Sequence, residues 1–214
     1  MSNNGYKVAA KAAGTEFTEK KSRFITYVEC VSTPAEAEAF FAAVRAKHPD
    51  ARHVCCACRT HTPFFEKCGD DGEPQGTAGR PMLGVLQKED VYDIAVAVVR
   101  YFGGILLGTG GLSRAYTRGC ADGVAAAGVM VMRRAVPMRM SVSYRYAEAI
   151  EKCIGRFSGR TEETEFAEKV GITCLIPQEN ADAFRRAILD LTAGETAPES
   201  GAPVLCKMDA PADF

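Results

Sequence analysis

The chain has 214 residues, of which 47% are hydrophobic and 25% are charged, and its formal net charge is −1. This is the composition of a globular protein with enough apolar material for a core, and the mean hydropathy of −0.09 argues against residence in a membrane. The near-neutral charge excludes a general, high-affinity binder of polyanions. The first residues lack the apolar core of a signal peptide, so we expect a cytoplasmic location and no membrane partner.

Strands and helices alternate in the first part of the chain. Thr33-Pro34-Ala35-Glu36 has the form of a capping box, and it predicts a helix that ends at His48-Pro49. A second helix is predicted from the apolar rhythm between Leu112 and Ala127, with Gly128 as its stop. The expected strands cover residues 24–30, 54–60 and 94–102. Residues 61–79 are expected to be irregular, and residues 81–86 to form a short segment that is either helical or extended.

A domain boundary is expected near residues 133–137, which divides the chain into residues 1–135 and 136–214. The second part reads strand, helix, strand, strand, helix, strand, with Asn180 as the cap of its second helix, and this order is that of a ferredoxin-like βαββαβ domain. The fold class is therefore α+β. The two parts also differ in charge, because the first has a balance of +3 from 17 basic and 14 acidic residues, whereas the second has −4 from 9 and 13.

The glycine-rich turn VVRYFGGILLGTGG at residues 98–111 joins an apolar strand to the long helix. The first amides of a helix lack partners within the helix and carry partial positive charge, so glycines there let an anion approach the backbone. Arg100, Arg114 and Arg118 are expected to close around that anion. The alternative is a tight connection with solvated arginines. No Gly-Lys-Ser/Thr follows, so the turn is not a Walker loop.

The acidic loop DDGEPQGTAGRPM at residues 70–82 holds Asp70, Asp71 and Glu73. Carboxylates at this spacing can chelate a divalent metal or act as acid and base. The alternative, which we favour, is a turn whose aspartates bond to their own backbone, and we expect no metal or other cofactor. Thr77 and Arg80 are candidates for further ligand contacts from the same loop.

Two further stretches have a structural explanation and a functional alternative. Residues 53–61 hold three of the nine cysteines and two histidines, but they have no CxxC pair, so buried reduced thiols are favoured over a zinc site. Phe64-Phe65 and Tyr101-Phe102 lie near basic residues and are candidates for stacking on bases. We favour core packing for both pairs.

Four motifs together resemble those of the YigZ/IMPACT family, its bacterial YigZ branch in particular. They are KKSRFI (20–25), HPDARH (48–53), DDGEPQGTAGRPM (70–82) and VVRYFGGILLGTGGL (98–112). The resemblance implies an N-terminal IMPACT domain of the ribosomal protein S-five domain-two-like superfamily. It also implies a C-terminal ferredoxin-like domain similar to the last domain of the translocating elongation factor. No established catalytic residue is carried over, and a segment resembling the extra N-terminal partner-binding domain of the eukaryotic relatives is not found.

The resemblance and the local excess of arginine favour an RNA- or ribosome-associated regulator of translation rather than an enzyme. Its acidic C-terminal domain is a candidate surface for a protein partner. The alternative is a metal-dependent enzyme acting on a phosphorylated small molecule or nucleotide, with metal held by Asp70, Asp71 and Glu73. The candidate anion- and nucleic-acid-binding residues are Arg100, Gly103, Gly104, Gly108, Thr109, Gly110, Gly111, Arg114 and Arg118, with Thr77 and Arg80 from the acidic loop and Lys20, Lys21, Arg23 and Arg52 extending the surface.

Overall fold

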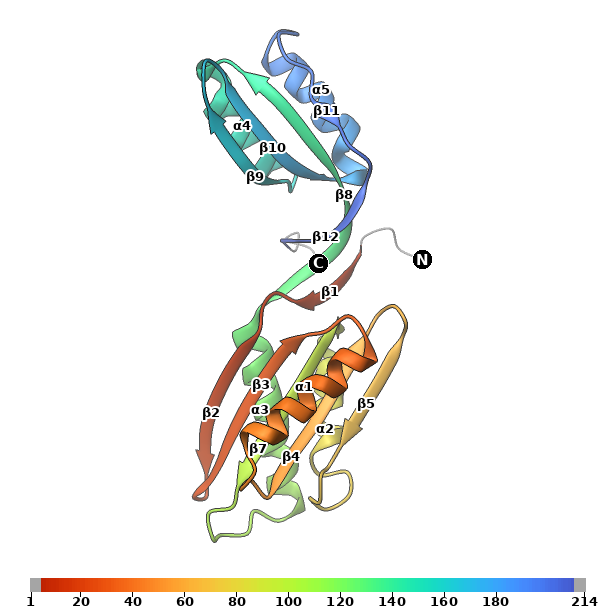
Figure 1. The fold of residues 1–214 in the computed structure, drawn as a ribbon, viewed down its shortest axis with the longest axis vertical. Helices are drawn as coiled ribbons and strands as arrows, with labels where there is room; N and C mark the ends of the chain where they lie inside the picture. Colours follow the sequence, from red (N-terminus) through yellow and green to blue (C-terminus); the bar gives the residue numbers. More distant parts are fainter. Residues whose placement is uncertain (1–4, 210–214) are drawn as a thin grey trace. The chain divides into compact units, whose positions relative to one another are not determined.

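The computed structural model describes residues 5–209, which divide into two compact units. One unit covers Tyr6–Met130, and the other begins at Val131. The helices and strands are drawn in Figure 1. Within residues 5–209, none of the helices has the length and apolar character needed to cross a membrane.

The first unit is built on a five-stranded antiparallel sheet with the strand order β2-β3-β7-β4-β5. Its strands are β2 (Ala13–Glu19), β3 (Ser22–Cys30), β4 (His53–Thr60), β5 (Phe65–Gly69) and β7 (Ile94–Tyr101). β2 and β3 form a hairpin whose two turn residues, Lys20 and Lys21, have positive φ angles of 44° and 63°. Positive φ at both positions matches the twist of the flanking strands. β1 (Tyr6–Ala9) and β6 (Val91–Tyr92) form a short parallel pair outside this five-stranded sheet.

Helices cover both faces of this sheet. α1 (Pro34–Lys47) packs on one face, whereas α2 (Gly79–Lys88) and α3 (Thr109–Ala127) pack on the other (Figure 1). The central strand β7 is fully buried from Ile94 to Val99, because each face carries its own apolar cluster. α1 begins as the capping box predicts, since the Glu36 amide donates to Thr33 Oγ1 at 3.2 Å.

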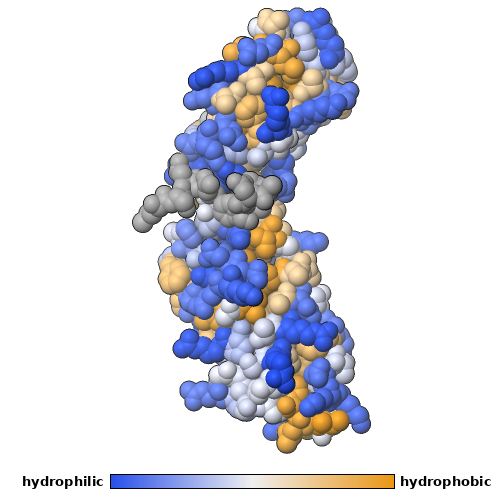
Figure 2. All heavy atoms as spheres, turned by 180° about the vertical axis from the view of Figure 1, so that it is seen from behind, coloured by the Kyte–Doolittle hydropathy of each residue, from blue (hydrophilic) through white to orange (hydrophobic). Residues whose placement is uncertain are grey.

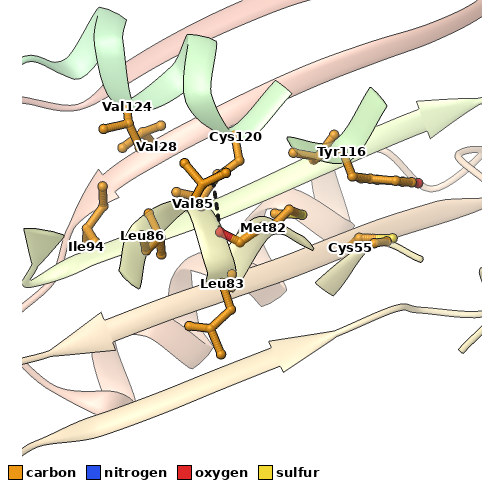
Figure 3. Packing of buried hydrophobic residues seen from close by; sticks show 14 of the residues in the cluster. Val28, Cys55, Met82, Leu83, Val85, Leu86, Ile94, Tyr116, Cys120 and Val124 are labelled. Carbon is orange, nitrogen blue, oxygen red and sulfur yellow. Dashed lines mark hydrogen bonds between the residues drawn. The ribbon is translucent and has the colours of Figure 1, made fainter. Parts of the chain in front are cut away.

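The core between α2 and α3 shows why these helices lie side by side. Figure 3 shows Cys120 of α3 directed toward Met82 of α2. The Cys120 thiol donates to the Met82 carbonyl at 3.5 Å, and Met82 and Leu86 are fully buried. Residues 81–86, whose sequence allows a helical or an extended segment, are helical, because a helix buries their apolar side chains on α3.

The second unit has the strand order β12-β8-β10-β9, with every neighbouring pair antiparallel. Its elements are β8 (Val129–Val142), α4 (Tyr144–Arg156), β9 (Arg160–Phe166), β10 (Val170–Pro177), the 3-10 turn η1 (Gln178–Asn180), α5 (Ala181–Leu191), β11 (Glu199–Ser200) and β12 (Val204–Met208). This order and these directions are those of a ferredoxin-like βαββαβ unit. The cluster around Ile150, Ile172 and Phe184 joins both helices to one face of the sheet.

Three sequence-based expectations are wrong in detail. Residues 61–79 are not wholly irregular, since β5 forms there by pairing with the edge of β4. β8 begins at Val129, before the boundary expected near residues 133–137, and runs through it. Asn180 does not cap α5 with its side chain, which instead donates to the Phe157 carbonyl at 2.9 Å. The last two differences arise from contacts with segments far along the chain, β12 for β8 and Phe157 for Asn180.

Candidate functional site

The three carboxylates of the acidic loop bond to three different parts of the protein. Asp70 accepts hydrogen bonds from the backbone amides of Gly76, Ala78 and Gly79 at 2.7, 3.0 and 2.8 Å, and it thereby caps the start of α2 from outside the helix. Burial acts to raise the pKa of Asp70, but the three amide donors outweigh it and hold the pKa below its usual value. The favoured reading of this loop, a turn whose aspartate bonds to nearby backbone, describes Asp70.

Asp71 fastens the loop to β4 and α1. Its carboxylate accepts from the Val54 amide at 2.6 Å and forms an ion pair with Arg45. The residue has a φ of 43°, which an aspartate tolerates better than most side chains. Its carbonyl accepts a hydrogen bond from His53 Nδ1 at 2.8 Å. Since a carbonyl cannot donate, the proton of the His53 ring lies on Nδ1.

Glu73 enters the protein interior and pairs with Arg100. Arg100 Nη1 donates to Glu73 Oε1 at 2.7 Å, and both residues are at most 7% exposed. The Tyr116 hydroxyl donates to the same oxygen at 2.9 Å, and Arg100 Nη2 donates to Ser22 Oγ at 3.3 Å. This buried cluster therefore connects the acidic loop, β7, α3 and the start of β3. We refer to Ser22, His53, Glu73, Arg100 and Tyr116 as the buried polar cluster.

The environment of the buried polar cluster fixes its protonation. Burial raises the pKa of Tyr116 well above its usual range, and the neighbouring Cys55 and Glu73 add to that effect, so the phenol keeps its proton and donates it. Burial lowers the pKa of His53, and the Glu73 carboxylate 3.8 Å from Nε2 opposes this only in part. His53 is therefore neutral near pH 7. One buried carboxylate thus faces one buried cation.

Arg100 is placed differently from the expectation that it meets a ligand at the surface. Its guanidinium is buried, lies 5.7 Å from the Phe24 ring and 5.6 Å from the Phe102 ring, and is paired with Glu73. Only its Nε lacks a hydrogen-bond partner among the described residues. Arg100 is held by the protein's own carboxylate, because a buried charge must be compensated. Ser22 Oγ, which accepts from Arg100, also accepts from the amide of Gly103 in the turn that follows β7.

Gly103 brings that turn against the β2–β3 hairpin. A Cβ atom at this position would lie 2.0 Å from the carbonyl carbon of Lys21, so only glycine allows the contact. The Gly103 amide also donates to Ser22 Oγ at 3.3 Å. Gly104 and Gly108 have φ angles of 85° and 72°, a region that favours glycine. The turn thus delivers the start of α3 next to Lys20.

The start of α3 lines a surface hollow of about 240 Å³. Gly108 precedes the helix without a side-chain cap, and Thr109, Gly110 and Arg114 are exposed. The hollow is lined by Phe17, Glu19, Lys20, Leu107, Gly111, Arg114, Ala115 and Arg118. Three of these residues are cationic and one is acidic. We call this feature the α3 hollow.

The two arginines of the α3 hollow are one helical turn apart, so they project from the same face of α3. Arg118 lies over the Phe17 ring at 4.4 Å and pairs with Asp122 at 3.4 Å. Both arginines are exposed, as are Lys20 and Lys21 at the tip of the hairpin. The structure therefore brings together Lys20, Gly111, Arg114 and Arg118 from the predicted set.

The other predicted residues do not line the α3 hollow. Arg23 is exposed and forms a two-pronged pair with Glu16 at 2.6 and 2.8 Å. Thr77 is buried, and its hydroxyl donates to the Pro74 carbonyl at 2.6 Å. Arg52 lies exposed before β4, and Arg80 lies exposed in the first turn of α2. Phe17, Glu19 and Leu107 line the hollow without having been predicted, and the β2–β3 hairpin brings Phe17 and Glu19 there.

The cysteine-rich strand is part of the core. Cys55 and Cys58 are fully buried in β4, and burial raises the pKa of Cys55 to about 12. Across residues 5–209, no group of three or more His, Cys, Asp or Glu side chains is arranged to hold a metal ion.

One residue of each aromatic pair is partly buried and the other is exposed. Phe65 and Tyr101 pack against the core, as favoured, whereas Phe64 and Phe102 are 67% and 41% exposed.

Comparison with known proteins agrees with the two units of the structure. Residues 20–124 match the model of the Impact N-terminal domain, and residues 141–195 match a domain of unknown function, DUF1949. The chain is 34% identical over 199 residues to IMPACT family member YvyE of Bacillus subtilis, covering 92% of each. It is 36% identical over 181 residues to IMPACT family member YigZ of Escherichia coli, covering 82% of this chain and 87% of that protein. A crystal structure of a hypothetical protein aligns with a TM-score of 0.59 and 31% identity over 98% of both chains.

Glu73 and Arg100 are expected to be strongly coupled in stability. Replacing either by Met leaves the other charge buried without its partner, at a cost of about 3–5 kcal/mol. The double variant Glu73→Met with Arg100→Met removes both charges, so its loss is expected to be smaller than the sum of the single losses by at least about 1 kcal/mol. Urea unfolding of the four proteins measures this. Additive losses would show that the two charges do not depend on each other.

Gly103→Ala is expected to destabilise the first unit by about 1–3 kcal/mol, because the new methyl group overlaps the backbone of Lys21. Gly110→Ala is the matched control, since its Cβ would meet only the end of the Arg114 side chain at 3.5 Å. Thermal unfolding compares the two variants. Equal melting temperatures would contradict the close contact between the glycine turn and the hairpin.

Asp70→Ala is expected to cost about 1–2 kcal/mol, because three amides lose their acceptor. The native pKa of Asp70 is lowered, so its contribution is complete above the unfolded value of about 3.9 and is lost as the pH falls through the native pKa. Stability of the variant should therefore depend less on pH in the acid range. Urea unfolding at neutral and acid pH tests this, with the exposed Asp50→Ala as control. A variant with the wild-type acid dependence would refute the assignment.

Proposed function

This chain belongs to the IMPACT family, and from that premise we propose that it is an RNA- or ribosome-associated regulator of translation. In this proposal the α3 hollow receives phosphate groups of an RNA strand. The observation that carries it is the convergence of Lys20, Arg114 and Arg118 on one hollow at the uncapped start of α3. The link to translation rests on the family resemblance described above.

The chemistry of the α3 hollow suits a phosphate. Guanidinium groups offer forked donors that match phosphate oxygens, and the first amides of α3 add partial positive charge. Gly110 and Gly111 have no side chain to keep an anion away from those amides. Glu19 is the only acidic residue that lines the hollow, and Asp122 is already paired with Arg118. The local balance therefore remains positive.

The size and surroundings of the α3 hollow favour a strand over a small metabolite. Pockets that enclose small molecules usually measure about 300–1,000 Å³, whereas this hollow has about 240 Å³. An exposed cation continues outside it at the hairpin tip, where Lys21 follows Lys20. A row of cations matches the repeated phosphates of a nucleic acid. The metal-dependent enzyme is less well supported, because the carboxylates of Asp70, Asp71 and Glu73 each accept hydrogen bonds from other parts of the protein.

The loop between β7 and α3 supplies apolar surface beside these cations. Phe102, Ile105 and Leu106 are 41%, 42% and 81% exposed. Figure 2 shows apolar surface among polar residues at the end of this unit where the loop lies. Unpaired bases of a single strand can pack on such side chains, most effectively on the Phe102 ring. Phosphate contacts would thus be provided by α3 and base contacts by the loop.

RNA binding is expected to depend on salt and on the α3 arginines. If about three phosphates are contacted, the slope of log affinity against log salt for a single strand is roughly −2. A variant carrying Arg114→Ala and Arg118→Ala should bind at least about tenfold more weakly and show a shallower slope. Fluorescence anisotropy with labelled oligouridine at several salt concentrations measures both quantities.

The matched control is Arg186→Ala, which removes an exposed arginine from α5. It is expected to leave the affinity and the slope unchanged. Circular dichroism establishes that all the variants are folded. No binding of oligouridine by the wild type at low salt, or equal binding by the double variant, would overturn the proposal.

A further inference from the structure

β9 is an open edge of the sheet in the second unit. It pairs with β10 on one side, and on its other side no strand pairs with it within residues 5–209. Glu163 to Phe166 lie in regular register with β10, while the irregularity of the strand falls between Thr173 and Cys174 of its partner. Alternate backbone amides and carbonyls of this stretch therefore face outward, where a further strand can bond to them.

The side chains along this edge are strongly acidic. Glu163 and Glu165 lie opposite Thr173 and Gly171, so they share the sheet face that α4 and α5 leave uncovered. That face forms an open hollow of about 920 Å³. Its charged lining residues are Arg139, Glu165, Glu168, Lys169, Glu195 and Glu199. Carboxylates outnumber cations, and Glu163 adds to their excess.

An exposed aromatic pair lies at the end of the same strand. Phe166 is 72% exposed and Tyr144 is 56% exposed, and their rings stack with centroids 6.4 Å apart. The Tyr144 hydroxyl donates to the Ala167 carbonyl at 2.7 Å, which fixes the Tyr144 ring beside the strand end. Rigid aromatic side chains of this kind are typical anchors of protein interfaces. An edge that bound its partner by charge alone would not need these two exposed rings.

We propose that the outer edge of β9 binds an extended, lysine- or arginine-rich segment of a partner protein by strand addition. The backbone of the segment pairs with residues 163–166, its basic side chains meet Glu163 and Glu165, and an apolar side chain rests on Phe166 and Tyr144. This mode of recognition takes its affinity from main-chain bonds and its specificity from alternate side chains. The site is distinct from the α3 hollow and does not depend on RNA binding.

The charges of the edge also indicate why the occupant is not a second copy of this chain. Pairing two β9 edges would bring Glu163 and Glu165 against the same carboxylates of the other copy, and like charges on facing strands are destabilising. Acidic edges therefore exclude self-pairing while they attract a basic strand. Both effects follow from the same two side chains.

A basic model peptide tests the proposal. The probe is a fluorescein-labelled peptide of about eight residues, the length of an ordinary strand, in which lysine alternates with valine. The full-length protein is expected to bind it, as measured by anisotropy. A variant with Glu163→Lys and Glu165→Lys should bind at least about tenfold more weakly, and Phe166→Ala about fivefold more weakly.

Two controls separate strand addition from simple charge attraction. A variant with Glu148→Lys and Asp190→Lys changes the net charge equally on the exposed surfaces of α4 and α5, and it is expected to keep the wild-type affinity. The same peptide with every backbone amide N-methylated keeps its charges but cannot donate along a strand, so it should bind at least about tenfold more weakly.

Four results would overturn the proposal. The first three are equal affinity for the N-methylated peptide, equal weakening by the control variant, and failure of the wild type to bind the peptide at low salt. A dimer in sedimentation velocity that the Glu163→Lys and Glu165→Lys variant abolishes would also overturn it, because the edge would then serve a second copy. Circular dichroism confirms that each variant is folded.

Discussion

The buried pair of Glu73 and Arg100 is the constraint around which the first unit is arranged. A charge taken out of water costs several kcal/mol unless it is paired and hydrogen-bonded, so each member requires the other in place. The pair lies between the acidic loop and β7, and Tyr116 and Ser22 connect it to α3 and to the hairpin. The loop, the strand, the helix and the hairpin are therefore connected by one buried polar cluster.

This arrangement separates the charged residues that bond within the protein from those presented to solvent at the α3 hollow. Asp70, Glu73 and Arg100 are the most conspicuous charged residues of the sequence motifs, yet all three bond within the protein. Arg114 and Lys20 are less conspicuous in the sequence, and they are the side chains presented to solvent at the α3 hollow. Glycine contributes at Gly103, where its missing side chain lets the turn approach the hairpin. The buried charged residues of the motifs thereby hold the elements that carry the exposed Lys20 and Arg114.

Much of the fold could be predicted from the sequence, because its signals are local. The apolar run of β7, the rhythm of α3 and the βαββαβ order of the second unit each follow from neighbouring residues. The early start of β8 could not be predicted, since its first residues pair with the distant strand β12. β5 was missed although it forms a hairpin with the neighbouring β4, because its sequence carries no clear apolar alternation. The sequence predicts that Lys20 and Arg114 share a surface, but not that both line one hollow. That Glu73 neutralises Arg100 was not foreseen, because 27 residues separate them and nothing local indicates which carboxylate turns inward.

The central claim is that an anionic strand contacts the start of α3. The most direct test is an amide-resolved NMR titration of the full-length protein with oligouridine. We predict that the largest shifts occur at the amides of Thr109, Gly110 and Gly111, with the side-chain signals of Arg114 and Arg118 moving over the same range of concentration. Shifts that leave these residues unchanged and gather elsewhere on the protein would contradict the account.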